Sequence, residues 1–296
     1  MTILLTLAGA ALILAALRDI FHELFHPSGS GSLSRALMRS LWHLARRVAS
    51  RFPSLLHIAG PAIMVSIIAS WAALLMVGWA LVIWPHLPGG VLLATGLKPS
   101  GNNGFLDALY VSLTTLTTLG YGDITPRSGL LRVLIPLEAL VGFGLLTASI
   151  SWVLSIYPVL SRRRSLTQKL LFLSRTEAES GLSANRDPQL LATLTTEVIE
   201  VQQDLIQFPV TYYFHGEEHD ALAVAMPYLM RLPKDLGPPE KLSADLRLHA
   251  TTLQQAIEDL TSTLSDLFLG VSDDPETVAK AYIRDHLYAQ KTDSTN

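Results

Sequence analysis

The chain has 296 residues, a net charge of −3 and no cysteine; 49% of its residues are hydrophobic and 16% are charged. Soluble globular domains carry about 25% charged residues, so the composition argues against a wholly soluble protein and indicates a membrane protein, at least in part. The absence of cysteine excludes disulfides, thiol nucleophiles and cysteine-ligated zinc.

The charges are unevenly distributed along the chain. Residues 1–164 contain 12 Lys and Arg and 5 Asp and Glu, which gives +7. Residues 165–296 contain 10 Lys and Arg and 20 Asp and Glu, which gives −10. This asymmetry predicts an apolar N-terminal part with few charges, most of them basic, followed by an acidic domain exposed to water.

The first predicted element is a transmembrane helix within residues 1–26. Its apolar run extends from Ile3 to about Leu24, which is long enough to cross a bilayer core of roughly 30 Å. A cleaved signal peptide is the alternative, but no Lys or Arg precedes the run. Arg18 and Asp19 also stand where small residues of a cleavage site belong.

Residues 27–58 form a basic segment with five arginines and no acid. By the positive-inside tendency, this segment is expected in the cytoplasm. Its apolar residues recur at the spacing of one helix face, which predicts an amphipathic helix lying on the inner membrane surface. An ordinary surface helix of a soluble segment is the alternative. The apolar positions are Leu33, Leu37, Leu41, Leu44 and Val48.

Two further spans follow. One runs from about Ile58 to Trp84 without a charge, and the other from about Val133 to Tyr157 with Glu138 as its only charge. Three arginines come directly after, at 162–164, so the chain is expected to leave the third span into the cytoplasm. The two basic clusters together predict a multi-pass protein of the cell membrane, with the N-terminus outside and the C-terminus cytoplasmic.

A short apolar segment lies between these two spans. Residues 105–117 predict a helix that is too short to cross a membrane, and the glycine-containing turn Thr118–Asp123 follows it. Irregular backbone at membrane depth is tolerated only where it lines a cavity or is buried in protein. The order of span, short helix, turn and span therefore predicts a re-entrant pore loop.

The six residues Thr118–Asp123 (TLGYGD) resemble the signature filter of potassium channels, with Leu119 in place of the more usual valine. Gly142–Ala148 is similar to the inner helix of bacterial two-transmembrane channels, and the resemblance covers about residues 60–160. It implies an all-α membrane fold. The implied divisions are a pore domain at 59–161, a pore helix at 104–117, a filter at 118–123 and an inner helix at 131–160. The charge and helix pattern of the remaining residues predict a cytoplasmic helical domain at 162–296.

The resemblance implies passive conduction of K⁺ through a homotetramer, with no organic cofactor, no enzymatic activity and no nucleic-acid partner. Backbone carbonyls replace the water shell of the ion when successive residues turn them toward the pore axis. That conformation needs positive φ at alternate positions, which glycine reaches without penalty. The implied filter residues are Thr118, Leu119, Gly120, Tyr121 and Gly122, with K⁺ at the first four.

Support for the filter is expected from residues around it. We expect the Tyr110 hydroxyl to restrain Asp123, because Thr114 stands where some relatives have a glutamate. Glu138 is expected to hydrogen-bond the back of the pore helix, since a carboxylate in lipid is unfavourable; a pore-facing, pH-sensing role and packing against another span are alternatives. No span carries the repeated arginines of a voltage sensor, so gating is expected at the inner helix. The hinge candidates are Ala139, Gly142 and Gly144.

Residues 162–296 predict helices that begin near Asp187, Ser243 and Asp274. An apolar face from Leu253 to Leu267 is typical of a helix packed in a bundle, with a short coiled coil as the alternative. A weak metal-site candidate comprises His215, Glu217, Glu218 and His219, for which an acid-rich helix start is the simpler interpretation.

The main functional hypothesis is thus a potassium-selective channel. A weakly selective cation channel is one alternative. A membrane-anchored signalling or scaffold protein with a vestigial pore is another. The sequence identifies neither the gating stimulus nor a ligand or partner protein of the acidic domain.

Overall fold

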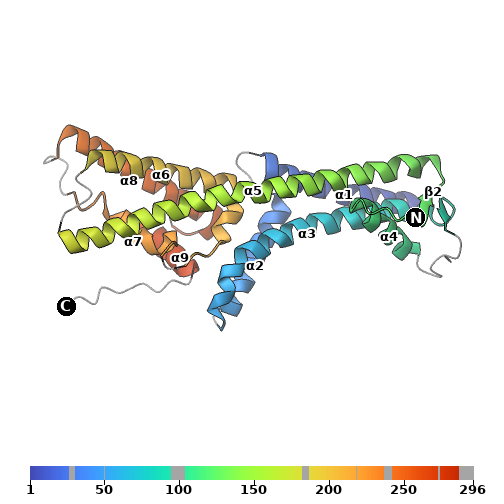
Figure 1. The fold of residues 1–296 in the computed structure, drawn as a ribbon, viewed down its shortest axis with the longest axis horizontal. Coiled ribbons are helices and arrows are strands. Elements are labelled where there is room, and N and C mark those ends of the chain that lie inside the picture. The colour runs from blue at the N-terminus through green and yellow to red at the C-terminus, as the bar shows by residue number, and fades with distance from the viewer. Residues whose placement is uncertain are drawn as a thin grey trace. The chain divides into compact units, whose positions relative to one another are not determined.

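The computed structural model describes residues 1–26, 31–49, 51–94, 104–181, 187–217, 219–236, 242–272 and 274–286 (Figure 1). Backbone contacts divide the chain into two compact units. The apolar unit comprises the described residues within 1–26, 30–37 and 64–154. The bundle unit comprises the described residues within 38–63 and 155–296.

Among the described residues, three helices are long and apolar enough to cross a membrane: α1 (Thr2–Phe25), α3 (Leu56–Ile83) and α5 (Gly129–Ser180). A bilayer core of about 30 Å needs about 20 helical residues, and each helix exceeds that length. A 3₁₀ turn, η2 (Trp84–His86), follows α3 directly. The predicted all-α membrane fold with three apolar spans is confirmed.

The helix α5 is longer than the inner helix predicted at residues 131–160. It is one continuous helix from Gly129 to Ser180 (Figure 1). The segment beyond residue 160 contains neither glycine nor proline before Gly181. Gly181 adopts a φ of 65°, and its amide donates to the Glu177 carbonyl at 3.0 Å. A left-handed glycine is a common helix terminator, which explains why α5 ends there.

Glycines bring α1 and α3 into close contact within the apolar unit. A Cβ on Gly9 would lie 2.5 Å from the Gly78 carbonyl oxygen, and one on Gly78 would lie 2.8 Å from Ile13. Apolar side chains have little hydrophobic preference for each other over lipid, so membrane helices associate through close backbone approach at small residues. These two glycines therefore position the first span against the second.

The pore-loop region contains α4 (Gly104–Leu116) and two short strands, β1 (Val91–Leu93) and β2 (Ile124–Pro126). The strands pair antiparallel, with Leu92 opposite Thr125. Side chains of α3, β1, α4 and α5 form one core. Its buried members are Ala80, Ile83, Val91, Ala108, Val111 and Leu131. The strand pair, which was not predicted from the sequence, joins the chain before α4 to the chain after the glycine-containing turn.

The basic segment folds as α2 (Ser32–Ala49), followed by the 3₁₀ turn η1 (Pro53–Leu55). The first turn of α2 is capped by a carboxylate from α1. Asp19 accepts hydrogen bonds from the amides of Leu33 at 2.9 Å and Ser34 at 3.2 Å, and from the Ser34 hydroxyl at 2.5 Å. The Trp71 indole of α3 donates to the same carboxylate at 2.9 Å. Asp19 thus joins the start of α2 to two apolar spans.

The bundle unit contains the helices predicted to begin near Asp187, Ser243 and Asp274, together with one further helix and two turns. They are α6 (Pro188–Gln207), η4 (Pro209–Tyr213), α7 (Leu222–Arg231), α8 (Ala244–Leu264), the π-turn η6 (Ser265–Leu269) and α9 (Pro275–Asp285). The side chains of Asp187, Ser243 and Asp274 cap α6, α8 and α9, as predicted. Leu253, Ile257, Leu260 and Leu264 are buried, and α8 packs against α6. This apolar face is therefore used within the bundle of one chain.

Candidate functional site

The turn at residues 118–123 follows α4 and is bonded back to its last turn. The Thr114 carbonyl accepts from the amides of Leu119 at 2.8 Å and Gly120 at 3.1 Å, and the Thr115 carbonyl accepts from the Thr118 amide at 2.9 Å. The Thr114 hydroxyl remains inside the helix and donates to the Tyr110 carbonyl at 3.0 Å. Thr114 thus contacts the turn through its backbone carbonyl rather than its side chain.

The backbone of the turn alternates in handedness. The φ angles of Thr118, Gly120 and Gly122 are 56°, 46° and 77°, and none of the residues between them has a positive φ. Within the chain, a Cβ on either glycine would meet no atom within 4 Å. Conformation rather than space therefore requires glycine at these two positions. The positive φ of Thr118 was not predicted, and for a threonine it is a strained conformation.

The C-terminal end of the turn is held at Asp123. The Tyr110 hydroxyl of α4 donates to Asp123 Oδ2 at 2.6 Å, and the Ile124 amide donates to Oδ1 at 3.1 Å. The Asp123 carbonyl accepts from the Ala94 amide at 2.8 Å, which extends the pairing of β1 with β2. The turn is thus anchored to α4 at both ends and to β1 at its C-terminal end.

Behind the turn, Ser112 of α4 connects three helices. Its hydroxyl lies 2.5 Å from Glu138 Oε1 of α5 and 2.9 Å from the Met76 carbonyl of α3. The side chains of Ser112 and Glu138 are completely buried. Because Ser112 lies on α4, Glu138 contacts the back of the predicted pore helix. Ser112 itself was not identified from the sequence, since a serine within an apolar helix has no distinctive pattern.

The three predicted hinge positions have different surroundings in α5, which is helical through all of them. Gly142 is buried, and a Cβ there would lie 2.0 Å from the Leu116 carbonyl oxygen. Gly144 is exposed, and a Cβ added there would have no atom of the chain within 4 Å. Ala139 is half-buried. Gly142 therefore has a packing role: it lets α5 approach the backbone at the end of α4.

The weak metal-site candidate is not assembled by the described residues. No group of three or more His, Cys, Asp or Glu that could hold a metal occurs among them, and Glu218 lies outside them. The ring centroids of His215 and His57 are 5.1 Å apart. The exposed His219 instead has its Nδ1 3.4 Å from a carboxylate oxygen of Glu217. Burial, followed by the neighbouring His57 and Arg163, lowers the pKa of His215 to about 4.

Comparisons with known proteins find a match in the region that contains the turn and its flanking helices. Residues 62–157 match a family model described as Ion channel. The chain is 24% identical over 273 residues to the uncharacterized membrane protein YdjJ of Bacillus subtilis, a match that covers 89% of this chain and 79% of that protein. A 55-residue stretch is 42% identical to two-pore potassium channel 3 of Arabidopsis thaliana and covers 17% of this chain and 13% of that one. No solved structure matches.

Proposed function

We propose that this chain, whose residues 62–157 match an ion-channel family model, is one subunit of a potassium-selective channel. The observation that carries the proposal is the alternating backbone of Thr118–Gly122, anchored to α4 and lying between two apolar helices. Such alternation is what a row of ion-binding carbonyls needs. The partial likeness to a protein named as a potassium channel supports the same conclusion.

The proposed mechanism is passive conduction. A K⁺ ion entering the filter exchanges its water shell for the carbonyl oxygens of Thr118, Leu119, Gly120 and Tyr121, with the Thr118 hydroxyl at the inner end. The carboxyl end of α4 precedes the filter, and its helix dipole favours a cation nearby. The Tyr110–Asp123 hydrogen bond and the β1–β2 pair hold the outer end in place.

We propose a homotetramer as the functional unit. One chain contributes one filter segment, and carbonyls must surround the ion from all sides to replace its water shell. Leu119 is 55% exposed and Tyr121 is 68% exposed in a single chain. Large apolar side chains exposed beside a polar ion path favour coverage by neighbouring subunits. The cell membrane is the proposed location, with the bundle unit in the cytoplasm and the gate at α5.

Two alternatives make different predictions. A weakly selective cation channel would conduct Na⁺ as well as K⁺, although the two filter glycines both have the positive φ of an ordered carbonyl row. A membrane-anchored signalling or scaffold protein would conduct neither ion, and the anchoring of the filter at both ends favours conduction over that function.

Purified protein in liposomes tests the proposal by ion flux. K⁺ flux that barium blocks, without Na⁺ flux, is the expected result. Gly120→Ala should abolish it, because alanine disfavours a φ of 46°. Gly89→Ala is the matched control, since Gly89 has no positive φ and no atom within 4 Å of the added Cβ. Equal Na⁺ flux, or full activity of Gly120→Ala, would contradict the proposal.

A further inference from the structure

One side of α2 is buried by the rest of the chain. Met38, Trp42 and Ala49 are each no more than 2% exposed, and they share one side of the helix. These three residues belong to the bundle unit. The packing therefore sets which face of α2 points inward and which is left outside.

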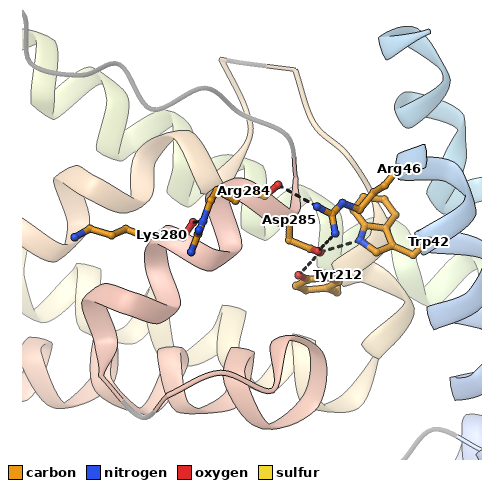
Figure 2. Close-up of polar contacts among 6 residues, drawn as sticks. All are labelled: Trp42, Arg46, Tyr212, Lys280, Arg284 and Asp285. Atoms are coloured by element: carbon orange, nitrogen blue, oxygen red, sulfur yellow. Dashed lines mark hydrogen bonds and ion pairs between the residues drawn. The ribbon is translucent and has the colours of Figure 1, made fainter. Parts of the chain in front are cut away.

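A single carboxylate fixes this orientation. Asp285, the last residue of α9, accepts from the Trp42 indole at 2.8 Å, from Arg46 at 2.7 Å and from the Tyr212 hydroxyl at 2.7 Å (Figure 2). A second Arg46 nitrogen lies 3.5 Å from the Arg284 carbonyl. Bonds to two residues one helical turn apart on α2 resist rotation of that helix about its axis. We call Asp285 and its three donors the Asp285 node.

The node leaves the leucine face of α2 only partly covered by protein. The face is defined by Leu33, Leu37, Leu41, Leu44 and Val48. Leu33, Leu44 and Val48 are 36%, 56% and 40% exposed, and the other two are half-buried. At 100° per residue, this face lies about 120° around the helix from Met38, Trp42 and Ala49. The apolar residues that give α2 its amphipathic pattern therefore remain available for an outside partner.

The surroundings of this face favour an anionic bilayer surface as that partner. Only six residues separate the end of α1 at Phe25 from the start of α2, and six more separate α2 from the start of α3. The Asp19 cap also holds the first turn of α2 against two apolar spans. Arg35, Arg47 and Arg51 are exposed, and residues 27–58 contain no acid. Apolar and basic residues together on one helix suit an interface rich in anionic lipid.

We propose that the leucine face of α2 lies in an anionic lipid surface, while the Asp285 node holds the opposite side on the bundle unit. Lipid composition then acts on α2, the same helix that Asp285 of α9 holds through its hydrogen bonds. This inference requires membrane insertion and is independent of the selectivity of the pore.

Site-directed labelling tests the proposal in the full-length protein, because the chain has no natural cysteine. Leu44→Cys and His43→Cys form a matched pair: the two residues are adjacent and exposed, and they lie on different sides of α2. Each is labelled with bimane and reconstituted in phosphatidylglycerol vesicles with and without brominated chains. The label at 44 should lose most of its emission to the bromines, whereas the label at 43 should keep it.

Two further variants separate the parts of the proposal. The double variant Arg47→Gln and Arg51→Gln, or replacement of phosphatidylglycerol by phosphatidylcholine, should reduce quenching at 44. Asp285→Asn should reduce the difference between labels 43 and 44, because the rotation of α2 is no longer fixed.

Three results would overturn the proposal. Equal quenching of the two labels in the protein with an intact Asp285 node would exclude a lipid-facing leucine side. Undiminished quenching in phosphatidylcholine would exclude the preference for anionic lipid. Disulfide formation between subunits of the unlabelled Leu44→Cys variant would assign the face to a second copy of the chain instead.

Discussion

The hydrogen bond from Tyr110 to Asp123 gives the sharpest single-atom prediction. Tyr110→Phe removes only the hydroxyl oxygen, which donates to Asp123 Oδ2 at 2.6 Å. The aromatic ring remains packed against the core of α3, α4 and α5. Asp123 keeps the Ile124 amide and the β1–β2 pairing beside it, so the carbonyl row keeps its shape. The expected effect is a less restrained outer end of the filter with unchanged ion preference.

The size of the effect follows from the kind of bond. A hydrogen bond to a charged group contributes about 1.5 to 3 kcal/mol, and both partners here are half-buried, which favours the lower end. Since about 1.4 kcal/mol is a factor of ten, the equilibrium between the conducting filter and a collapsed one should shift roughly tenfold toward collapse.

Single-channel recording in planar bilayers measures this shift. Tyr110→Phe should shorten the conducting bursts about tenfold, on the scale of that bond, while the K⁺ to Na⁺ permeability ratio stays constant. Asp123→Ala and the double variant complete a mutant cycle, in which the two changes should not add because each removes one partner of the same bond. Unchanged bursts, or additive effects in the double variant, would refute the reasoning.

Two other perturbations test different parts of the fold. Gly142→Ala places a Cβ 2.0 Å from the Leu116 carbonyl and should lower the yield of assembled protein, whereas Gly144→Ala, with nothing within 4 Å in the chain, should assemble normally; size-exclusion chromatography compares them. The bundle unit should lose stability in acid, because burial lowers the pKa of His215 to about 4 and that of His286 below its usual value. A histidine with a depressed native pKa binds fewer protons in the folded state than in the unfolded state. The free energy of unfolding is therefore highest above about pH 6.5 and decreases as the pH falls toward 4. For His215, which is only partly buried, the loss is about 2 kcal/mol. Thermal unfolding followed by circular dichroism should show it, and His215→Gln should flatten the pH dependence.

The features that could be predicted from sequence are those written in local patterns. The three apolar helices follow from runs of residues such as 58–84, because span length is a local property. The helix starts at Asp187, Ser243 and Asp274 follow from cap residues next to the turns they close. The glycine-containing turn stands out because few backbone conformations need glycine at alternate positions.

Features built from residues far apart in the chain could not be predicted in this way. Asp285 contacts Trp42 across 243 positions, and no periodicity links an acid in α9 to an indole in α2. Ser112 is significant only because Glu138 and the Met76 carbonyl happen to meet it. The strands β1 and β2 have three residues each, too few to show an alternating pattern. Most of the predicted residue roles in the filter and gate remain predictions, because they concern ions and subunits.

The most direct test of the central claim is the reversal potential of the full-length protein in a planar bilayer, with K⁺ on one side and Na⁺ on the other. An ordered carbonyl row at Thr118–Tyr121 predicts a current carried by K⁺ alone, with a reversal potential far from zero in the direction set by the K⁺ gradient. A reversal potential near zero would contradict the account, because it would mean that Na⁺ passes the filter as readily as K⁺.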